Sequence, residues 1–291
     1  MEQEKRKVTA INFDLTHARH DRAHCLTPGL FRSLKRGDRK KLKLDVTYTY
    51  GNGEVIQFRG PEPLGADDLR VLQGLVAMGG VRGVVLQQED ESTIGKQLRQ
   101  FLDLKWDAIE KDAMIVKGSF RQLAREIGYC DFGNSQFKTI KASIERLNEV
   151  TIYIEKDGRR WSSRILLGYA SDEREGKLFI ALNPRLAEAI MERRQYTCID
   201  MAEVRGLKTD PTRIIHQRLC GWIDPGTAKE VEIDTLCGYV WPDEVGAEAM
   251  KKRRQTIRKA LTELSGIGWR VAECAKGKWT IIRRYVSLDM Y

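Results

Sequence analysis

A chain of 291 residues, with 42% apolar and 31% charged residues, has the composition of a globular protein and is long enough for two domains with cores of their own. No stretch approaches the roughly eighteen apolar residues of a membrane span, and the charged residues 1–8 lack the apolar segment of a signal peptide, so we expect a cytoplasmic protein with no membrane partner. The six cysteines are scattered without a CxxC pair, which indicates neither a disulfide framework nor a zinc module.

The net charge of +9 is concentrated at the two ends of the chain. Residues 1–45 carry 12 Lys and Arg against 6 Asp and Glu, and residues 246–291 carry 11 against 4. Clustered cations release condensed counterions from a polyanion, which is the main sequence-independent source of affinity for nucleic acid. The alternative is a solvated basic surface without a partner.

The N-terminal part predicts a basic arm followed by a hairpin and a helix. Residues 14–45 contain many cations and little apolar periodicity, with one short helix expected near Leu30–Leu34. Alternating apolar residues on both sides of Gly51–Gly53 predict a tight hairpin. Asp67 and Asp68 are expected to cap a helix that Gly79–Gly80 ends, and a strand near Val84–Leu86 and a helix near Lys96–Trp106 are expected to follow.

A helix, helix and hairpin pattern begins at Ser119, a plausible N-cap. A longer helix over Asn134–Asn148 and two strands on either side of Asp157–Gly158 follow it. This order is that of a winged helix-turn-helix unit. A strand at Lys177–Leu182 and a helix after Pro184 are expected to complete the first domain.

The same pattern recurs about 117 positions later, after a strand at Thr197–Ile199 and a short helix at Met201–Gly206. Its expected elements are a helix from Pro211 to Ile223, a short strand with Val231 and Ile233, a short helix at Thr235–Tyr239, a long helix at Ala247–Ser265, and a hairpin of Trp269–Glu273 with Trp279–Arg283. Leu123, Ile140, Ile144, Leu147, Ile152 and Ile154 correspond to Leu236, Ile257, Leu261, Leu264, Trp269 and Val271. We therefore predict an α+β protein of two tandem winged helix-turn-helix domains, residues 1–195 with the basic arm and residues 196–291 as the main DNA-reading domain.

The two long helices offer matching polar surfaces. When their apolar residues point inward, the outward residues are Asn134, Ser135, Lys138 and Lys141 in the first copy and Lys251, Lys252, Gln255 and Arg258 in the second. In a helix-turn-helix the N-terminal half of the second helix enters the major groove, where Lys, Arg, Asn and Gln read base edges. Arg253 and Arg254 lie nearer the core side and are expected to reach the DNA backbone.

The hairpin turns add Arg159 and Arg160 in the first copy and Lys276 and Lys278 in the second, where a wing could reach the adjacent DNA backbone. These residues complete the predicted DNA-binding set. The alternative is that both helices only present solvated basic surfaces.

Other clusters favour structural roles over chemistry. His17, His20, His24 and Cys25 crowd the arm, but no second Cys or His cluster follows at a zinc-finger spacing. His216, four residues before Cys220 on one helix, is expected to satisfy a local hydrogen bond. Gly95–Lys96 lacks the upstream glycine of a P-loop. We predict no catalytic residue, no metal and no cofactor.

Several long strings resemble the RepC replication initiators of IncQ-type broad-host-range plasmids. They are Leu26–Leu34 (LTPGLFRSL), Gly60–Gly79 (GPEPLGADDLRVLQGLVAMG), Tyr169–Glu173 (YASDE), His216–Gly226 (HQRLCGWIDPG) and Ile233–Pro242 (IDTLCGYVWP). The resemblance covers residues 17–283. It implies binding of double-stranded DNA at direct repeats (iterons) of a plasmid origin, opening of adjacent AT-rich DNA, and loading of the plasmid-encoded helicase and primase.

Two other functions remain open from the residues alone. A winged-helix transcriptional regulator would bind a palindromic operator in place of tandem repeats. A relaxase or primase would need metal-binding acids, or a tyrosine near histidines, which the sequence does not offer. Self-association as a homodimer through the first domain is a further hypothesis.

Overall fold

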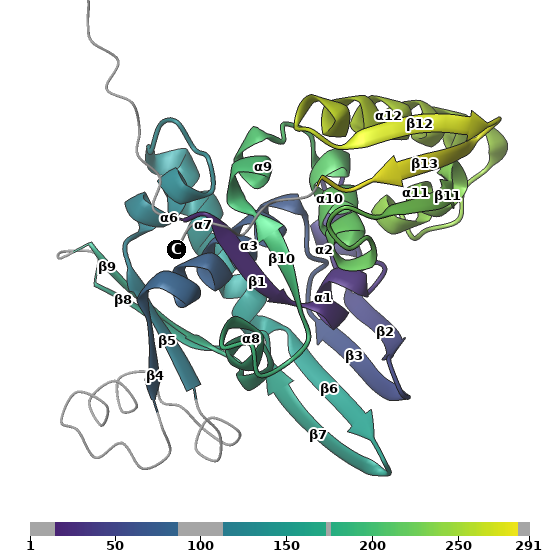
Figure 1. Ribbon diagram of the computed structural model, residues 1–291. Helices are drawn as coiled ribbons and strands as arrows, with labels where there is room; N and C mark the ends of the chain where they lie inside the picture. The colour runs from purple at the N-terminus through teal and green to yellow at the C-terminus, as the bar shows by residue number, and fades with distance from the viewer. Residues whose placement is uncertain (1–14, 87–112, 173–175, 285–291) are drawn as a thin grey trace, which may run out of the picture.

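The computed structural model describes residues 15–86, 113–172 and 176–284, and in these segments helices are packed among small antiparallel sheets (Figure 1). Four sheets are present among the described residues, with strand orders β1-β10, β2-β3-β6-β7, β4-β5-β9-β8 and β11-β13-β12. All nine strand pairs within these sheets are antiparallel. The α+β class is therefore confirmed. The predicted helix at Lys96–Trp106 lies outside the described residues.

The first half of the chain contains helices α3 (Ala66–Arg82), α6 (Phe120–Glu126) and α7 (Asn134–Glu149). Ser119 caps α6 as predicted, because its hydroxyl accepts a hydrogen bond of 3.0 Å from the Gln122 amide. The strands of one adjoining sheet are β2 (Leu44–Tyr50), β3 (Glu54–Gly60), β6 (Thr151–Lys156) and β7 (Arg159–Arg164). Those of the other are β4 (Gly83–Leu86), β5 (Ala113–Gly118), β8 (Leu166–Asp172) and β9 (Lys177–Leu182), with α8 (Pro184–Ile190) after it.

The second half repeats this order on a smaller scale. Its elements are β10 (Tyr196–Asp200), α9 (Met201–Gly206), α10 (Asp210–Trp222), β11 (Ala228–Glu232), α11 (Ile233–Val240), α12 (Ala247–Gly266), β12 (Arg270–Ala275) and β13 (Lys278–Ile282). Ile233, expected in the strand, is instead the first residue of α11.

The apolar positions that define the repeat are core residues in both halves. Leu123, Ile140, Ile144, Leu147 and Ile152 are fully buried, and Ile154 is nearly so. Their counterparts Leu236, Ile257, Leu261, Leu264 and Trp269 are buried, and Val271 packs against the core while partly exposed. The alignment of the two halves thus reflects equivalent packing.

The N-terminal segment differs from the predicted arm. Strand β1 (His17–Asp21) pairs with β10, so the start of the described chain lies beside residues 196–200 near the middle of the molecule (Figure 1). The helix expected at Leu30–Leu34 is wrong: the short helices are α1 (Arg22–Leu26) and α2 (Asp38–Lys41). Phe31 instead forms an isolated β-bridge with Leu64, which places this part of the segment in extended conformation.

Helix α3 also corrects a prediction, because it continues through Gly79 and Gly80 to Arg82. A Cβ at Gly79 would lie 2.9 Å from Ile190 Cδ1 and 3.1 Å from Met114 Sδ. Gly79 therefore allows α8 and β5 to approach α3 closely, and it does not terminate the helix.

Contacts between the two halves are extensive. Besides the β1–β10 pair, the side-chain amide of Gln73 on α3 donates a buried hydrogen bond of 2.6 Å to the Gln217 oxygen on α10. Buried apolar residues of both halves form one continuous cluster. The division at residues 195 and 196 remains a prediction. No helix in the described parts of the chain combines the length and apolar character needed to cross a membrane.

Candidate nucleic-acid interface

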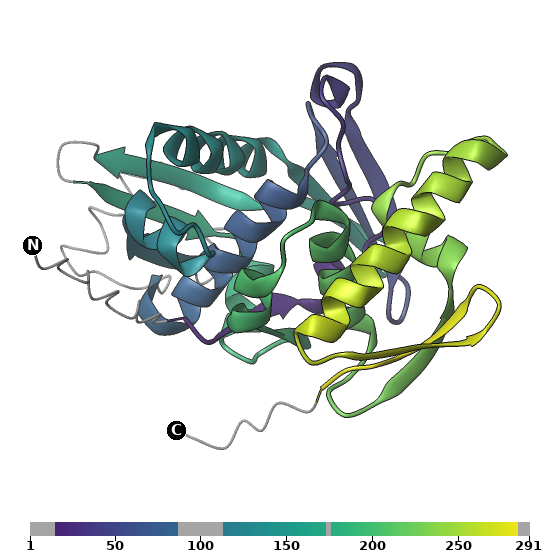
Figure 2. The same cartoon turned by 90° about the horizontal axis from the view of Figure 1, so that it is seen from above.

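Helix α12 separates apolar from charged residues along its length. Ile257, Ala260, Leu261 and Leu264 are buried against α10 and α11, whereas Lys251, Lys252, Gln255 and Arg258 are exposed, as predicted. The helix begins after an exposed loop, residues 242–246, so its first turns are accessible. Seen from above (Figure 2), the N-terminal end of α12 projects from the body of the molecule. This end presents a row of cations and one amide to solvent.

Arg253 and Arg254 are engaged within the protein. Arg253 Nη1 donates to the carbonyl oxygens of Asp243 (2.6 Å) and Trp241 (3.3 Å), and its guanidinium lies 5.5 Å from the Trp241 ring. Arg254 forms a bidentate pair with Asp234 on α11, at 2.6 and 2.7 Å. Both arginines therefore hold α12 against the preceding loop and helix. Their guanidinium groups contact the protein, unlike those of the exposed row.

The hairpin of β12 and β13 lies next to α12. Lys276 at its turn is exposed, and Gly277 has φ of 79° there. Lys278 Nζ lies 2.5 Å from Glu230 Oε2, and Arg258 Nη2 lies 3.9 Å from Glu273 Oε1. The longer Arg258 pair is at the limit of an ion pair and is exposed, so this arginine can turn to another anion at little cost.

The corresponding surface of α7 carries less charge. Asn134, Ser135 and Lys138 are exposed in the first turns, as predicted. Lys141 is only half-exposed, with its ammonium 5.9 Å from the Phe137 ring. The first copy therefore offers mainly neutral hydrogen-bonding groups.

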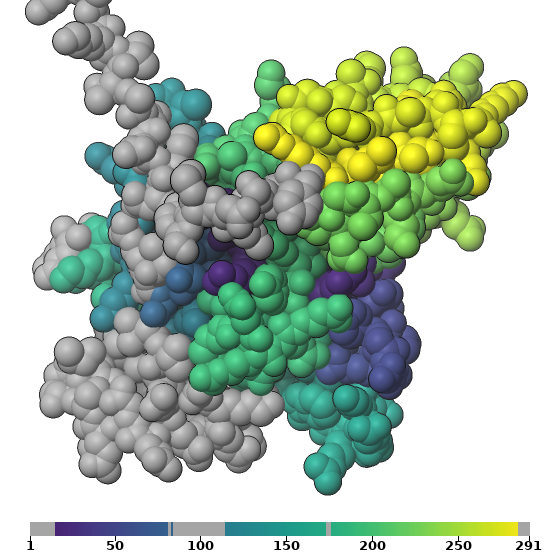
Figure 3. All heavy atoms as spheres, in the orientation of Figure 1, coloured from purple at the N-terminus to yellow at the C-terminus, as the bar shows by residue number. Residues whose placement is uncertain are grey.

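The two hairpin turns lie at different edges of the molecule. Arg159 and Arg160 are exposed after the turn of Asp157 and Gly158, where both residues have positive φ (50° and 72°). The guanidinium of Arg160 lies 5.3 Å from the Tyr153 ring. In Figure 1 the β6–β7 hairpin extends at the lower edge and the β12–β13 hairpin at the upper right, and Figure 3 shows the C-terminal elements gathered at the upper right of the molecule. The two hairpin turns therefore do not lie on one surface.

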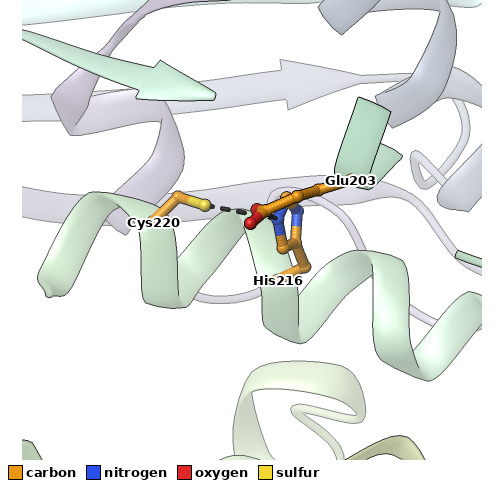
Figure 4. Close-up of side chains that lie close together, drawn as sticks. All are labelled: Glu203, His216 and Cys220. Carbon is orange, nitrogen blue, oxygen red and sulfur yellow. Dashed lines mark hydrogen bonds and ion pairs between the residues drawn. The ribbon is translucent and has the colours of Figure 1, made fainter. Parts of the chain in front are cut away.

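A buried group of three ionisable side chains lies beneath α12. His216 Nε2 lies 2.7 Å from Glu203 Oε2 and 3.5 Å from Cys220 Sγ (Figure 4). Burial lowers the pKa of His216, but the Cys220 sulfur and the Glu203 carboxylate outweigh it and raise the pKa to about 10. Trp269 Nε1 donates to the same Glu203 oxygen at 3.1 Å.

This group has the donor types of a metal site, since the three ligand atoms lie within 4.8 Å of one another. However, the imidazolium and the indole N–H already satisfy the carboxylate. The arrangement therefore works as a buried ion pair that joins α9, α10 and the residue before β12, and the local hydrogen bond predicted for His216 is confirmed.

The histidines of the N-terminal segment are packing residues. His20 and His24 are buried with ring centroids 5.9 Å apart, and His24 lies 5.2 Å from the Phe58 ring. Burial lowers the pKa of His24 to about 3, so this imidazole is neutral. Cys25 is buried beside α10, and burial raises the pKa of its thiol.

The family model of replication protein C (RepC) matches residues 12–285 of the chain. The chain belongs to the RepC family. The resemblance found in the sequence is thereby confirmed, and this RepC chain is a replication protein; the IncQ type remains a prediction. No curated protein sequence matches it.

Structures of RctB share the fold of this RepC chain at low sequence identity. Crystal structures of domains 2 and 3 of RctB match with TM-scores of 0.54 and 0.51 at 12% identity. They cover 88% and 87% of the RepC chain and 95% and 94% of their own. A structure of the Pi initiator protein in complex with iteron DNA matches with a TM-score of 0.42 at 13% identity, over 74% of the RepC chain and 94% of its own.

One cationic surface was missed by the sequence-based site prediction. Lys35, Arg36, Lys40, Lys41 and Lys43 are exposed around α2. The run of cations is evident in the sequence, but its place beside the long helices depends on contacts with residues far along the chain.

Proposed function

We propose that this RepC chain initiates plasmid replication by binding direct repeats of the origin as duplex DNA, through two winged-helix units. In this proposal α12 enters a major groove with Lys251, Lys252, Gln255 and Arg258, and the β12–β13 hairpin reaches the neighbouring backbone with Lys276. α7 makes the corresponding contact of the first unit.

The observation that carries the proposal is the exposed row of cations on the first turns of α12. Four features support it together: the row is solvent-accessible, it is opposite a buried apolar stripe, it begins a long helix that follows a short helix, and a hairpin with a basic turn follows it. Lys and Arg pair with guanine and Gln with adenine in the major groove, so this row can read bases as well as bind phosphate.

The unequal charge of the two surfaces suggests that α12 and α7 make different contributions to DNA binding. α12 would supply most of the sequence reading, while Asn134, Ser135 and Lys138 of α7 add contacts on the adjacent turn of the duplex. Arg159 and Arg160 would approach the backbone. Association driven by such contacts is fast and weakens steeply as salt concentration rises.

Opening of the adjacent AT-rich DNA and loading of the plasmid helicase and primase would follow binding, as the family resemblance implies. In this proposal the chain acts as a scaffold and carries out no covalent chemistry itself. Exchange between monomer and dimer through the first unit is part of the same proposal, and sedimentation with and without repeat DNA tests it.

Footprinting on the origin of the plasmid that encodes the chain tests the function. We expect protection at evenly spaced direct repeats, and weaker protection for Lys252→Ala/Gln255→Ala. The variant Lys208→Ala/Lys229→Ala, which changes two exposed lysines outside α7 and α12, is the control. Protection of a promoter palindrome and not of the repeats would favour a transcriptional regulator.

A further inference from the structure

We propose that the segment of residues 32–43, here called the bridge segment, is a third DNA contact that binds phosphates between the grooves occupied by α7 and α12. This inference rests on the proposed function and adds a surface to it. It is carried by the segment's charge, by its attachment to both halves and by its position beside the two long helices.

The charge of the bridge segment faces solvent. Lys35, Arg36, Lys40, Lys41 and Lys43 are exposed, and none of them forms an ion pair with the described residues. The acid within the segment, Asp38, accepts a hydrogen bond of 2.7 Å from the Lys35 amide and so stabilises the turn. Five cations thus remain available within twelve residues, which suits a polyanion.

One end of the bridge segment is attached to the C-terminal half. The Ser33 amide donates to the Val240 carbonyl at 3.0 Å, at the end of α11. Arg32 pairs with Asp243 in the loop that leads to α12. Because the Arg32 side chain is largely buried (13% exposed), this attachment is stiffer than an ordinary surface pair.

The other end is attached to the N-terminal half through one carboxylate. Arg39 donates to the Pro63 carbonyl at 2.8 Å and to Asp68 Oδ2 at 3.1 Å. Arg146 of α7 donates to the other oxygen of Asp68 at 3.0 and 2.8 Å. Asp68 is fully buried and also caps α3 through the Gly65 amide, so it fixes the bridge segment relative to α7.

These attachments place the cations on the proposed DNA side. In Figure 2, α2 stands at the same edge of the molecule as α7 and the N-terminal end of α12, and between them. A hollow of about 350 Å³ there is lined by Lys35, Arg36 and Lys40 together with Asp67 and Asp210. Asp210 is paired with Arg213 at 3.1 Å, so the cations of Lys35, Arg36 and Lys40 face the Asp67 carboxylate, which accepts a hydrogen bond from the neutral Tyr129 hydroxyl. Three cations against one carboxylate leave the hollow with a net positive charge.

A duplex that contacts both long helices would therefore pass over the bridge segment. Lysines on a short, exposed turn have no fixed geometry for reading base edges, so the contact would be with phosphates and independent of sequence. It would strengthen binding to every duplex alike and set the register of the two groove contacts.

Salt dependence of binding tests the contact. The full chain and its Lys40→Ala/Lys41→Ala variant are titrated with a duplex of arbitrary sequence over a range of salt concentrations. If both lysines contact phosphates, the slope of log affinity against log salt falls by about 2. The Lys208→Ala/Lys229→Ala control removes the same charge and is expected to leave the slope unchanged; equal slopes for the two variants would overturn the bridge contact.

A third variant separates this inference from the proposed function. Lys251→Ala/Lys252→Ala should reduce both the slope and the footprint on direct repeats. If it does so while the Lys40→Ala/Lys41→Ala variant matches the control, the DNA-reading role of α12 stands and the bridge contact falls. Hydroxyl-radical cleavage provides a second readout, because the Lys40→Ala/Lys41→Ala variant should lose protection only between the two groove contacts.

Discussion

Arg254 and Arg258 lie one turn apart on α12 and differ in how firmly the protein holds them. The Arg254 guanidinium is bonded to both oxygens of Asp234, whereas Arg258 has one contact of 3.9 Å. We expect Arg258→Ala to weaken binding to repeat DNA by about 1 to 3 kcal/mol, the usual range for a base-reading arginine. Arg254→Ala, the matched control, should change affinity little, as measured by fluorescence anisotropy. An equal loss for both variants would contradict this assignment.

Because of His216, the stability of the C-terminal half is expected to fall at alkaline pH. Its folded pKa of about 10 lies above the ordinary value of 6.5, so its contribution to stability is complete below pH 6.5 and is lost as pH rises toward 10. The groups around it are Glu203, Cys220, Trp269 and, near Glu203, Arg283.

The variant His216→Gln tests this pair. Because it leaves the buried Glu203 carboxylate without its cation, we expect a loss of about 3 to 5 kcal/mol near pH 6. Denaturant titrations between pH 6 and 10 should show wild-type stability declining across this window and the variant changing less. Parallel curves for the two proteins would show that His216 is not charged in the folded state.

The exposed set on α12 could be predicted because helical geometry alone decides which side chains oppose Ile257, Leu261 and Leu264. The partner of Arg254 could not be predicted in this way. Asp234 is twenty positions away on another helix, and only the packing of α11 on α12 brings the two side chains together.

The end of helix α3 shows where a local sequence rule fails. A glycine pair often marks the end of a helix, but Gly79 lies within the last turn of α3, where Ile190 and Met114 leave no room for a side chain. That requirement comes from α8 and β5, which are distant in sequence. By contrast, α7, α9, α12 and both hairpins follow their own apolar periodicity and were located within a few residues.

The glycines of α3 offer a matched pair of substitutions. A Cβ at Gly74 would lie 2.4 Å from Ile127 Cγ2 and 2.7 Å from Leu123 Cδ1, whereas a Cβ at Gly80 meets nothing within 4 Å. We expect Gly74→Ala to destabilise the protein by about 1 to 3 kcal/mol through overpacking against α6. Gly80→Ala should be neutral or stabilise by up to about 1 kcal/mol through helix propensity. Thermal melts of both variants measure this, and a stable Gly74→Ala protein would mean that α6 is less tightly packed.

The two halves are joined by structure that the sequence pattern did not reveal. The repeat predicted the internal order of each unit, but the pairing of β1 with β10 connects segments almost 180 positions apart and leaves no periodic signal in either. Near this pair, Asp21 and Glu54 form a network with Arg185 and Arg194. All four residues belong to the first half, and the network anchors the end of β1, the strand that pairs with β10. The pairing of β1 with β10 therefore contributes to holding the two halves together.

Asp21 makes the anchoring of β1 sensitive to acid. Burial by itself would raise the pKa of Asp21, but the guanidinium of Arg185, aided by that of Arg194, lowers it to about 2 from an ordinary value of 3.8. Because the pKa of Asp21 is lowered in the folded state, its carboxylate stabilises the fold above pH 3.8, and this contribution is lost as pH falls toward 2. For a shift of this size the contribution is on the order of 2 to 3 kcal/mol.

We therefore expect Asp21→Asn to be less stable at pH 7 by about 3 kcal/mol, because Arg185 then keeps only Glu54 as a buried counter-ion. Between pH 4 and 2 its stability should fall less than that of the wild type, since the variant has no carboxylate to protonate at this position. Asp45→Asn is the control, because Asp45 is exposed and its pair with Arg59 spans 3.5 Å at the surface. If Asp21→Asn and Asp45→Asn lost the same stability at pH 7 and showed the same change between pH 4 and 2, the buried network would not stabilise the fold around β1.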